Sequence, residues 1–195
     1  MPKKSVTHAV ACLYWKCSRW TPVDGDFPAE PGMVIGAPHT SNWDFVHMLA
    51  LAWRHRAPVR WLGKKSLFKG LAGPIMRRLG GIPVDRANPA GVVDEVLAQV
   101  SSGERFYLVI SPDGSRTNDG YWKSGFYRIA RKADLPVTLG FIDRATRTVG
   151  IGPTLTLTGD VGADMDEIRA FYADKHGARP ERRREPRLAN EHLRP

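Results

Sequence analysis

The sequence contains few cysteines and no long apolar run. Its two cysteines, Cys12 and Cys17, are too few for a secreted disulfide scaffold. On one helix they would lie about 140° apart around the axis, so we interpret them as reduced packing residues in a reducing cytoplasm. No run of about eighteen apolar residues occurs, and the N-terminus lacks the apolar core of a signal peptide. We therefore expect neither a membrane-spanning helix nor a secretory leader.

Several motifs of common enzyme classes are also missing. No Gly-x-Ser-x-Gly elbow is present, which disfavours a serine hydrolase of the α/β type. No Gly-x-Gly-x-x-Gly fingerprint opens a helix, and no Cys/His cluster has zinc spacing. Gly63-Lys64-Lys65-Ser66 resembles the end of a phosphate loop, but Pro58 stands where that loop needs its first glycine. The sequence thus predicts no bound cofactor and no metal.

Positive charge is in excess. The chain has 29 Lys and Arg against 20 Asp and Glu, a formal net charge of +9. Such a charge favours binding to polyanions. These include nucleic acid, an anionic membrane surface and phosphorylated substrates. Part of it lies in residues 178–195, which we interpret as a basic, disordered tail. That tail either contacts lipid headgroups or only keeps the protein soluble.

The N-terminal residues 1–20 suit an amphipathic helix over about 5–20. Such a helix either lies on a membrane surface or docks on the protein's own core, and the pattern does not choose between them. The apolar positions at helical spacing are Val6, Val10, Leu13, Tyr14 and Cys17.

Strands and helices alternate through residues 21–177. The pattern predicts strands over 33–37, 59–62, 82–84, 106–110, 136–141 and 149–157. It predicts helices over 44–56, 67–79, 89–101 and 123–133, with a last one opening near 164. This order is typical of an α/β sandwich around one sheet, so we expect a single domain.

His39 follows a buried strand, and Asp44 comes five residues later. Ligands bind at the carboxyl ends of strands in α/β sheets. On one continuous helix this spacing would place the two side chains about 140° apart. They meet only if His39 lies outside the helix and folds back over its first turn. A carboxylate there would fix the imidazole tautomer and raise its basicity.

Two arginines stand in sharp turns that follow apolar strands. Arg86 ends Gly81-Ile82-Pro83-Val84-Asp85-Arg86, and Arg116 ends Ser111-Pro112-Asp113-Gly114-Ser115-Arg116. Two guanidinium groups with backbone N–H groups near Gly114 would suit a phosphate. Further positive charge is available from Lys64 and Lys123.

Four ordered blocks between about residues 32 and 172 resemble the lysophospholipid acyltransferase family of the glycerolphosphate acyltransferase superfamily. Each block alone is weak evidence for the family, but the four blocks in this order and at this spacing are specific to it. They are His39-Thr40-Ser41-Asn42-Trp43-Asp44, the two arginine-bearing turns above, and Leu135-Pro136-Val137-Thr138-Leu139-Gly140.

The resemblance implies a mechanism. His39 would take a proton from an acceptor hydroxyl, Asp44 would hold His39, and the oxygen would attack the thioester of acyl-CoA or acyl-carrier protein directly. The third block differs from the family, because Asp113 stands where glutamate is usual. Pro38 also stands where enzymes that make phosphatidic acid often have asparagine. The residues implied to hold or shape the acceptor's phosphate site are Arg86, Asp113, Gly114, Ser115 and Arg116.

The resemblance also implies a fold and partners. We expect a single-domain mixed sheet flanked by helices, with the acyltransferase domain over 21–177. The partners would be an acyl thioester donor, a lipid acceptor and an anionic membrane surface, with no nucleic acid. The acceptor of first choice is 1-acyl-glycerol-3-phosphate, with a glycolipid or another hydroxylated lipid as alternatives. The protein would be cytoplasmic, either free or peripheral on the inner face of the cell membrane. A basic nucleic-acid-binding protein and a non-catalytic lipid-binding protein remain competing hypotheses.

Overall fold

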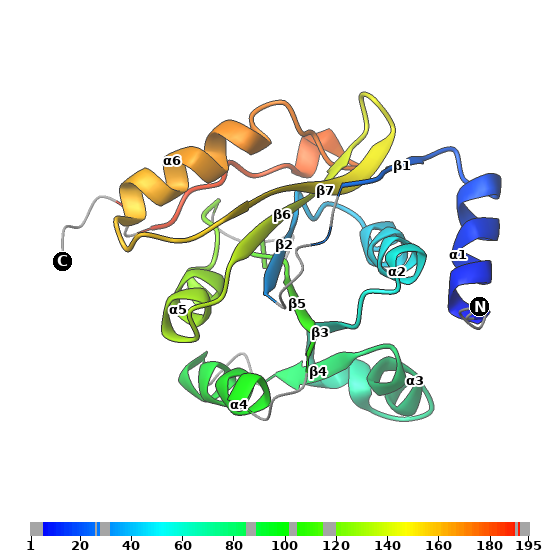
Figure 1. Ribbon diagram of the computed structural model, residues 1–195, viewed down its shortest axis with the longest axis horizontal. Helices are drawn as coiled ribbons and strands as arrows, with labels where there is room; N and C mark the ends of the chain where they lie inside the picture. Colours follow the sequence, from blue (N-terminus) through cyan, green and yellow to red (C-terminus); the bar gives the residue numbers. More distant parts are fainter. Residues whose placement is uncertain are drawn as a thin grey trace.

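The computed structural model describes residues 6–25, 27, 32–84, 89–101, 105–114, 120–189 and 191. Within these ranges seven strands form one sheet in the order β1-β7-β6-β2-β5-β3-β4 (Figure 1). The strands are β1 Thr21–Val23, β2 Met33–Ala37, β3 Val59–Lys64, β4 Gly81–Val84, β5 Tyr107–Ile110, β6 Val137–Asp143 and β7 Thr148–Leu155. The α-helices are α1 Val6–Cys17, α2 Trp43–His55, α3 Ala72–Arg78, α4 Pro89–Ser101, α5 Gly125–Lys132 and α6 Val161–Tyr172. Two 3-10 helices are η1 Lys65–Phe68 and η2 Pro180–Arg182.

The sheet is mixed. Strands β6, β2, β5, β3 and β4 run parallel, whereas β7 pairs antiparallel with β6, and β1 pairs parallel with β7. This arrangement confirms the predicted α/β fold with one mixed sheet. The chain leaves β2 through α2 toward β3, and later leaves β5 through α5 toward β6 on the other side of β2. The carboxyl ends of β2 and β5 therefore lie where connections depart in opposite directions, a usual place for a ligand.

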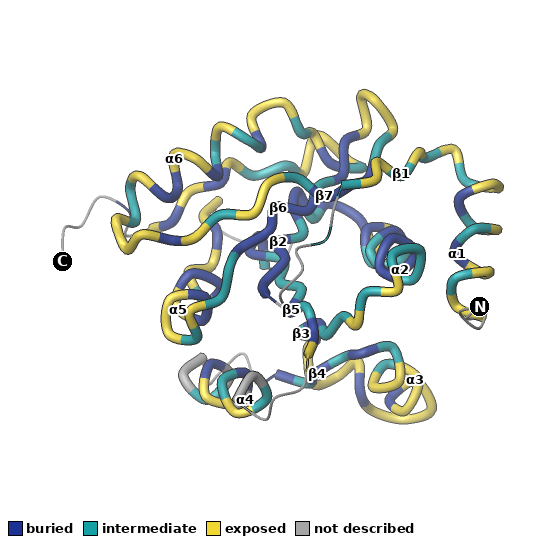
Figure 2. Tube along the Cα trace, viewed as in Figure 1, coloured by how far each residue is buried: buried dark blue, intermediate teal, exposed yellow. Residues whose placement is uncertain are grey.

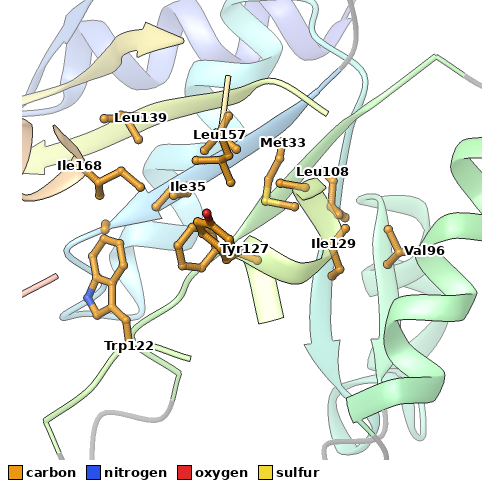
Figure 3. Close-up of a cluster of buried hydrophobic side chains, with 14 of the residues drawn as sticks. Met33, Ile35, Val96, Leu108, Trp122, Tyr127, Ile129, Leu139, Leu157 and Ile168 are labelled. Atoms are coloured by element: carbon orange, nitrogen blue, oxygen red, sulfur yellow. The ribbon is translucent and has the colours of Figure 1, made fainter. Parts of the chain in front are cut away.

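Helices cover both faces of the sheet. Helices α4, α5 and α6 pack against one face, and α1 and α2 pack against the other (Figures 1 and 2). Successive residues of β2 point to opposite faces, so Met33 and Ile35 enter the first core while Val34 enters the second. Figure 3 shows the first core, where Ile168 of α6 and Ile129 of α5 lie among side chains of the central strands.

Helix α1 docks on α2 through one side only. Trp15 is buried and its indole N–H donates to the carbonyl oxygen of Ala50. Three residues spaced along the other side, Val6, Val10 and Leu13, are exposed. The structure thus shows the docked alternative for the N-terminal helix, and it also leaves an apolar face pointing outward. None of the helices in the described ranges has the length and hydropathy needed to cross a bilayer.

Two parts of the sheet region differ from the sequence prediction. The helix expected over 67–79 is divided into η1 and α3, because Gly70 between them adopts a left-handed conformation with φ of 60°. Strand β1 was not predicted, since three residues carry no periodic pattern. It forms because Thr21 to Val23 pair with β7.

The C-terminal segment also differs from the disorder predicted for 178–195, as far as the structure describes it. One of its arginines, Arg183, donates to the main-chain carbonyl oxygens of Lys175 and Tyr172. Leu188 is buried and forms a bridge with Trp122. Arg183, which composition assigns to a solvated tail, therefore holds this segment to the end of α6.

Candidate active site

His39 and Asp44 come together at the end of β2. The strand stops at Ala37, the Ala37–Pro38 peptide bond is cis, and His39 lies before the start of α2. Asp44 is in the first turn of that helix. The Nδ1 atom of His39 is 3.3 Å from the Oδ2 atom of Asp44. The loop therefore folds back over the helix in the way that the spacing requires.

The loop is held in place by the Asp44 carboxylate. Its Oδ2 atom accepts the backbone N–H groups of Thr40 and Ser41, each at 2.7 Å. The carboxylate is buried at a helix N-terminus, where the helix dipole favours negative charge. Asn42 occupies the N-cap without a side-chain cap bond, and Ser41 Oγ accepts the N–H of Trp43 at 3.3 Å.

Asp113 supports the same loop from the next strand. Its carboxylate is buried, and Oδ2 accepts the backbone N–H of His39. Asp113 does not belong to the wall of the cavity described below, although its neighbours Pro112 and Gly114 do. The place of Asp113 in a phosphate site stays a prediction. Its carboxylate lies behind His39 and fixes the main chain that carries the imidazole.

Burial raises the pKa of the Asp113 carboxyl above its ordinary value of 3.8. The N–H and the charge of His39 oppose this rise, as do the Trp122 indole and the charge of Arg184. A carboxyl whose pKa is higher in the folded than in the unfolded chain favours folding below the unfolded pKa. That contribution is lost as the pH rises through the folded pKa.

Asp113→Asn is therefore expected to change the pH dependence of stability. Asparagine keeps an oxygen for the His39 N–H but never ionises. The melting temperature of the variant, relative to wild type, should increase as the pH rises from about 4 toward 7. Thermal unfolding of both proteins across this range measures it. A constant or decreasing difference would contradict the assigned direction of the pKa.

The imidazole opens onto a cavity of about 820 Å³. This volume falls in the range of small-molecule sites. His39 and Asp44 lie on its wall with Lys64, Gly114 and Lys123. Most of the remaining wall is apolar and comes from α2 and from the strands that it covers. This apolar lining includes Phe45, Met48 and Leu51 of α2 and Val34, Trp61 and Val109 of the sheet.

The predicted anion-binding residues fall into two groups. Lys64, Lys123 and Gly114 line the cavity, and Gly114 adopts a left-handed conformation with φ of 67° that favours glycine. Arg86, Ser115 and Arg116 lie outside the described residues, so their part in a phosphate site stays a prediction. Within the described ranges, no three His, Cys, Asp or Glu side chains cluster as metal ligands would.

One supporting residue was missed by the sequence analysis. His47 is buried one turn after Asp44, and its Nδ1 atom lies 2.8 Å from the hydroxyl of Tyr14 on α1. Burial lowers the pKa of His47, opposed by the charge of Asp44. His47 therefore links α1 to the helical turn that carries Asp44. The available signal was its spacing, three residues after Asp44 on the same side of the helix.

The loop of residues 38–42, which carries His39, also touches the C-terminal segment. The backbone N–H of Arg179 donates to Thr40 Oγ1 at 3.0 Å. Gly177 approaches Thr40 so closely that a Cβ atom there would lie 2.9 Å from its side chain. The residue that follows His39 is thus fixed by α2 on one side and by the end of the chain on the other.

Comparisons with known proteins bear on the family and the fold. A family model described as acyltransferase matches residues 23–138, more than half of the chain. A 1-acyl-sn-glycerol-3-phosphate acyltransferase of Streptococcus pneumoniae is 31% identical over 113 residues, covering 56% of this chain and 42% of the relative. The match thus spans about two fifths of that relative's length. The crystal structure of the 1-acyl-sn-glycerophosphate (LPA) acyltransferase PlsC from Thermotoga maritima has a TM-score of 0.58 and 17% identity. That match covers 86% of this chain and 73% of the other, and it supports the fold alone.

Proposed function

This chain belongs to the acyltransferase family, and we propose that it transfers a fatty acyl group from a thioester donor to a hydroxyl of a lysophospholipid-like acceptor. The donor is acyl-CoA or acyl-carrier protein. One observation carries the proposal: the His39 imidazole lies 3.3 Å from a buried carboxylate and faces a large, mostly apolar cavity. A base beside an apolar space is what acyl transfer to a lipid hydroxyl requires.

The proposed step uses His39 as general base. With the Nδ1 proton directed at Asp44, the Nε2 atom is the basic nitrogen of the neutral ring. Nε2 takes the proton of the acceptor hydroxyl as its oxygen attacks the thioester carbonyl carbon. The carbon–sulfur bond then breaks, and the departing thiolate takes the proton from the imidazolium. Asp44 keeps the ring oriented and stabilises its charge.

The cavity supports the choice of substrates. Its apolar wall suits a fatty acyl chain, and Lys64 and Lys123 beside it suit a phosphate. The Streptococcus pneumoniae relative is named for the acceptor 1-acyl-glycerol-3-phosphate, which makes this the first candidate here. A glycolipid or another hydroxylated lipid is the alternative. Arg86, Ser115 and Arg116 are the further residues that we propose for the phosphate.

The exposed side of α1 supports a place at a membrane. Val6, Val10 and Leu13 form an outward apolar stripe on a chain of formal net charge +9. Such a combination favours the surface of an anionic bilayer. We propose a cytoplasmic protein that is peripheral on the inner face of the cell membrane.

Product analysis tests the proposed reaction. The purified chain is incubated with long-chain acyl-CoA or acyl-carrier protein and a mixed pool of hydroxylated lipids. Mass spectrometry identifies acylated products, and a thiol reagent measures the free thiol. The expected result is phosphatidic acid formed with stoichiometric release of thiol. Absence of thiol release with both donors would reject the proposal, and vesicle binding without turnover would favour a lipid-binding protein.

A further inference from the structure

The region of η1 and α3 exposes large apolar side chains. Leu71, in the turn between them, is 96% exposed, whereas Ile75 and Leu67 are 57% and 48% exposed. Figure 2 shows this region largely exposed beside the edge strand β4. Exposing leucine and isoleucine side chains to water in this way is energetically unfavourable. A cluster of them therefore indicates a surface that a partner covers. We call these three residues with the surrounding cations the apolar–basic surface.

The basic residues of this surface lie in a stretch of sequence that has no acidic residue. No Asp or Glu occurs between Asp44 and Asp85. All five basic residues of η1, α3 and their flanks are exposed, and Arg77 packs over the ring of Phe68. Apolar side chains surrounded by cations match the two layers of an anionic bilayer surface, its acyl region and its phosphates. The five basic residues are Lys64, Lys65, Lys69, Arg77 and Arg78.

The turn that carries Leu71 is held by close packing. The Phe68 ring is buried and stacks on the Trp61 ring of β3, with 5.7 Å between the ring centroids. A Cβ atom on Gly73 would lie 2.3 Å from the carbonyl oxygen of Phe68, so α3 begins directly against η1. The exposed leucine is therefore presented on a fixed scaffold.

The apolar–basic surface is continuous with the cavity of the candidate active site. Leu67 is exposed and also lines the cavity. Lys64 and Met76 line the same cavity. An acyl chain that enters past these residues stays in contact with apolar groups from the surface to the cavity wall. A bilayer docked here would therefore lie next to the cavity opening.

We propose that the apolar–basic surface docks this protein on anionic bilayers and places the cavity opening at the lipid plane. Leu71 and Ile75 enter the interfacial region, and the cations bind lipid phosphates. The inference rests on the proposed function only in assigning lipids to the cavity. Bilayer binding itself is measured without turnover. An acidic carrier protein is the competing partner for such a surface.

Vesicle sedimentation tests the docking. Wild type and the double variant Leu71→Glu/Ile75→Glu are mixed with phosphatidylcholine vesicles that contain or lack phosphatidylglycerol. We expect binding to the anionic vesicles to fall about tenfold or more in the variant, because two apolar contacts become repulsive charges. The matched control Val23→Glu/Tyr121→Glu adds the same charge at other exposed apolar positions and should bind like wild type. Val23 lies in β1, at the opposite sheet edge from β4.

Three results would overturn the docking proposal. The first is wild-type vesicle binding by Leu71→Glu/Ile75→Glu. The second is an equal loss in the control, which would assign the effect to net charge. The third is equal binding of wild type to vesicles with and without phosphatidylglycerol, which would remove the cations from the docking. If Leu71→Glu/Ile75→Glu binds vesicles like wild type but has a higher KM for acyl-carrier protein, the surface binds that partner instead of a bilayer. Failure of the proposed function would be seen in a separate measurement. In that case the wild-type protein would not turn over soluble short-chain thioesters.

Discussion

Replacing His39 with alanine is expected to lower kcat for thioester-dependent acylation by about 10²–10⁴-fold, the usual contribution of a general base. KM should change little, because the cavity wall that would hold the acyl chain is left intact. The fold should persist, since the bonds that fix the loop use the backbone N–H of His39 and the side chain of Asp44. Asp44→Asn should lower kcat by a smaller factor, because the base remains while its orientation is weakened.

Steady-state kinetics of both variants at saturating donor provide the measurement. His176→Ala is the matched control, because His176 is exposed and lies outside the cavity wall. Circular dichroism and thermal unfolding establish that each variant is folded. A folded His39→Ala protein that keeps the wild-type kcat would remove His39 from the mechanism.

Filling the cavity at Gly36 is expected to change the preference for acyl-chain length. Gly36 lies in β2 and lines the cavity. A Cβ atom there would be 3.8 Å from Val109 Cγ1 and 4.0 Å from the carbonyl oxygen of Ile110, which are ordinary contacts. A leucine side chain would therefore project into the space that we assign to the acyl chain, without displacing the backbone.

For Gly36→Leu we expect kcat/KM with long-chain thioesters to fall about 10–100-fold. Displacing two or three methylene groups at about 0.8 kcal/mol each accounts for this range. Short-chain thioesters should be much less affected, and Gly36→Ala should show a smaller effect of the same kind. A series of acyl-CoA chain lengths measures the change. Equal loss at every chain length would mean that the acyl chain binds elsewhere.

The sequence predicts the central features of the site because they are local. A histidine before a helix and an aspartate in its first turn have few ways to meet, and the loop adopts one of them. The strand and helix order follows from periodicity in the same way. The strand order does not, because pairing of β2 with both β5 and β6 depends on contacts between distant parts of the chain.

The function of Asp113 could not be predicted from sequence. Residue type and the adjacent turn place an acid near His39, but they do not say which way the carboxylate points. The structure turns it inward to the His39 N–H. The C-terminal segment was missed for a related reason. Its composition suggests solvation, whereas Arg169 donates to the carbonyl oxygen of Pro186 and to Glu191, which holds the segment against α6.

The hydrogen bond from Arg179 to Thr40 joins residues 139 positions apart. During synthesis the loop around His39 is therefore made long before its last support exists. Residue 179 is made after all of the strands and α-helices of the described ranges. A nascent chain therefore lacks this contact with the residue next to His39 until translation has passed residue 179.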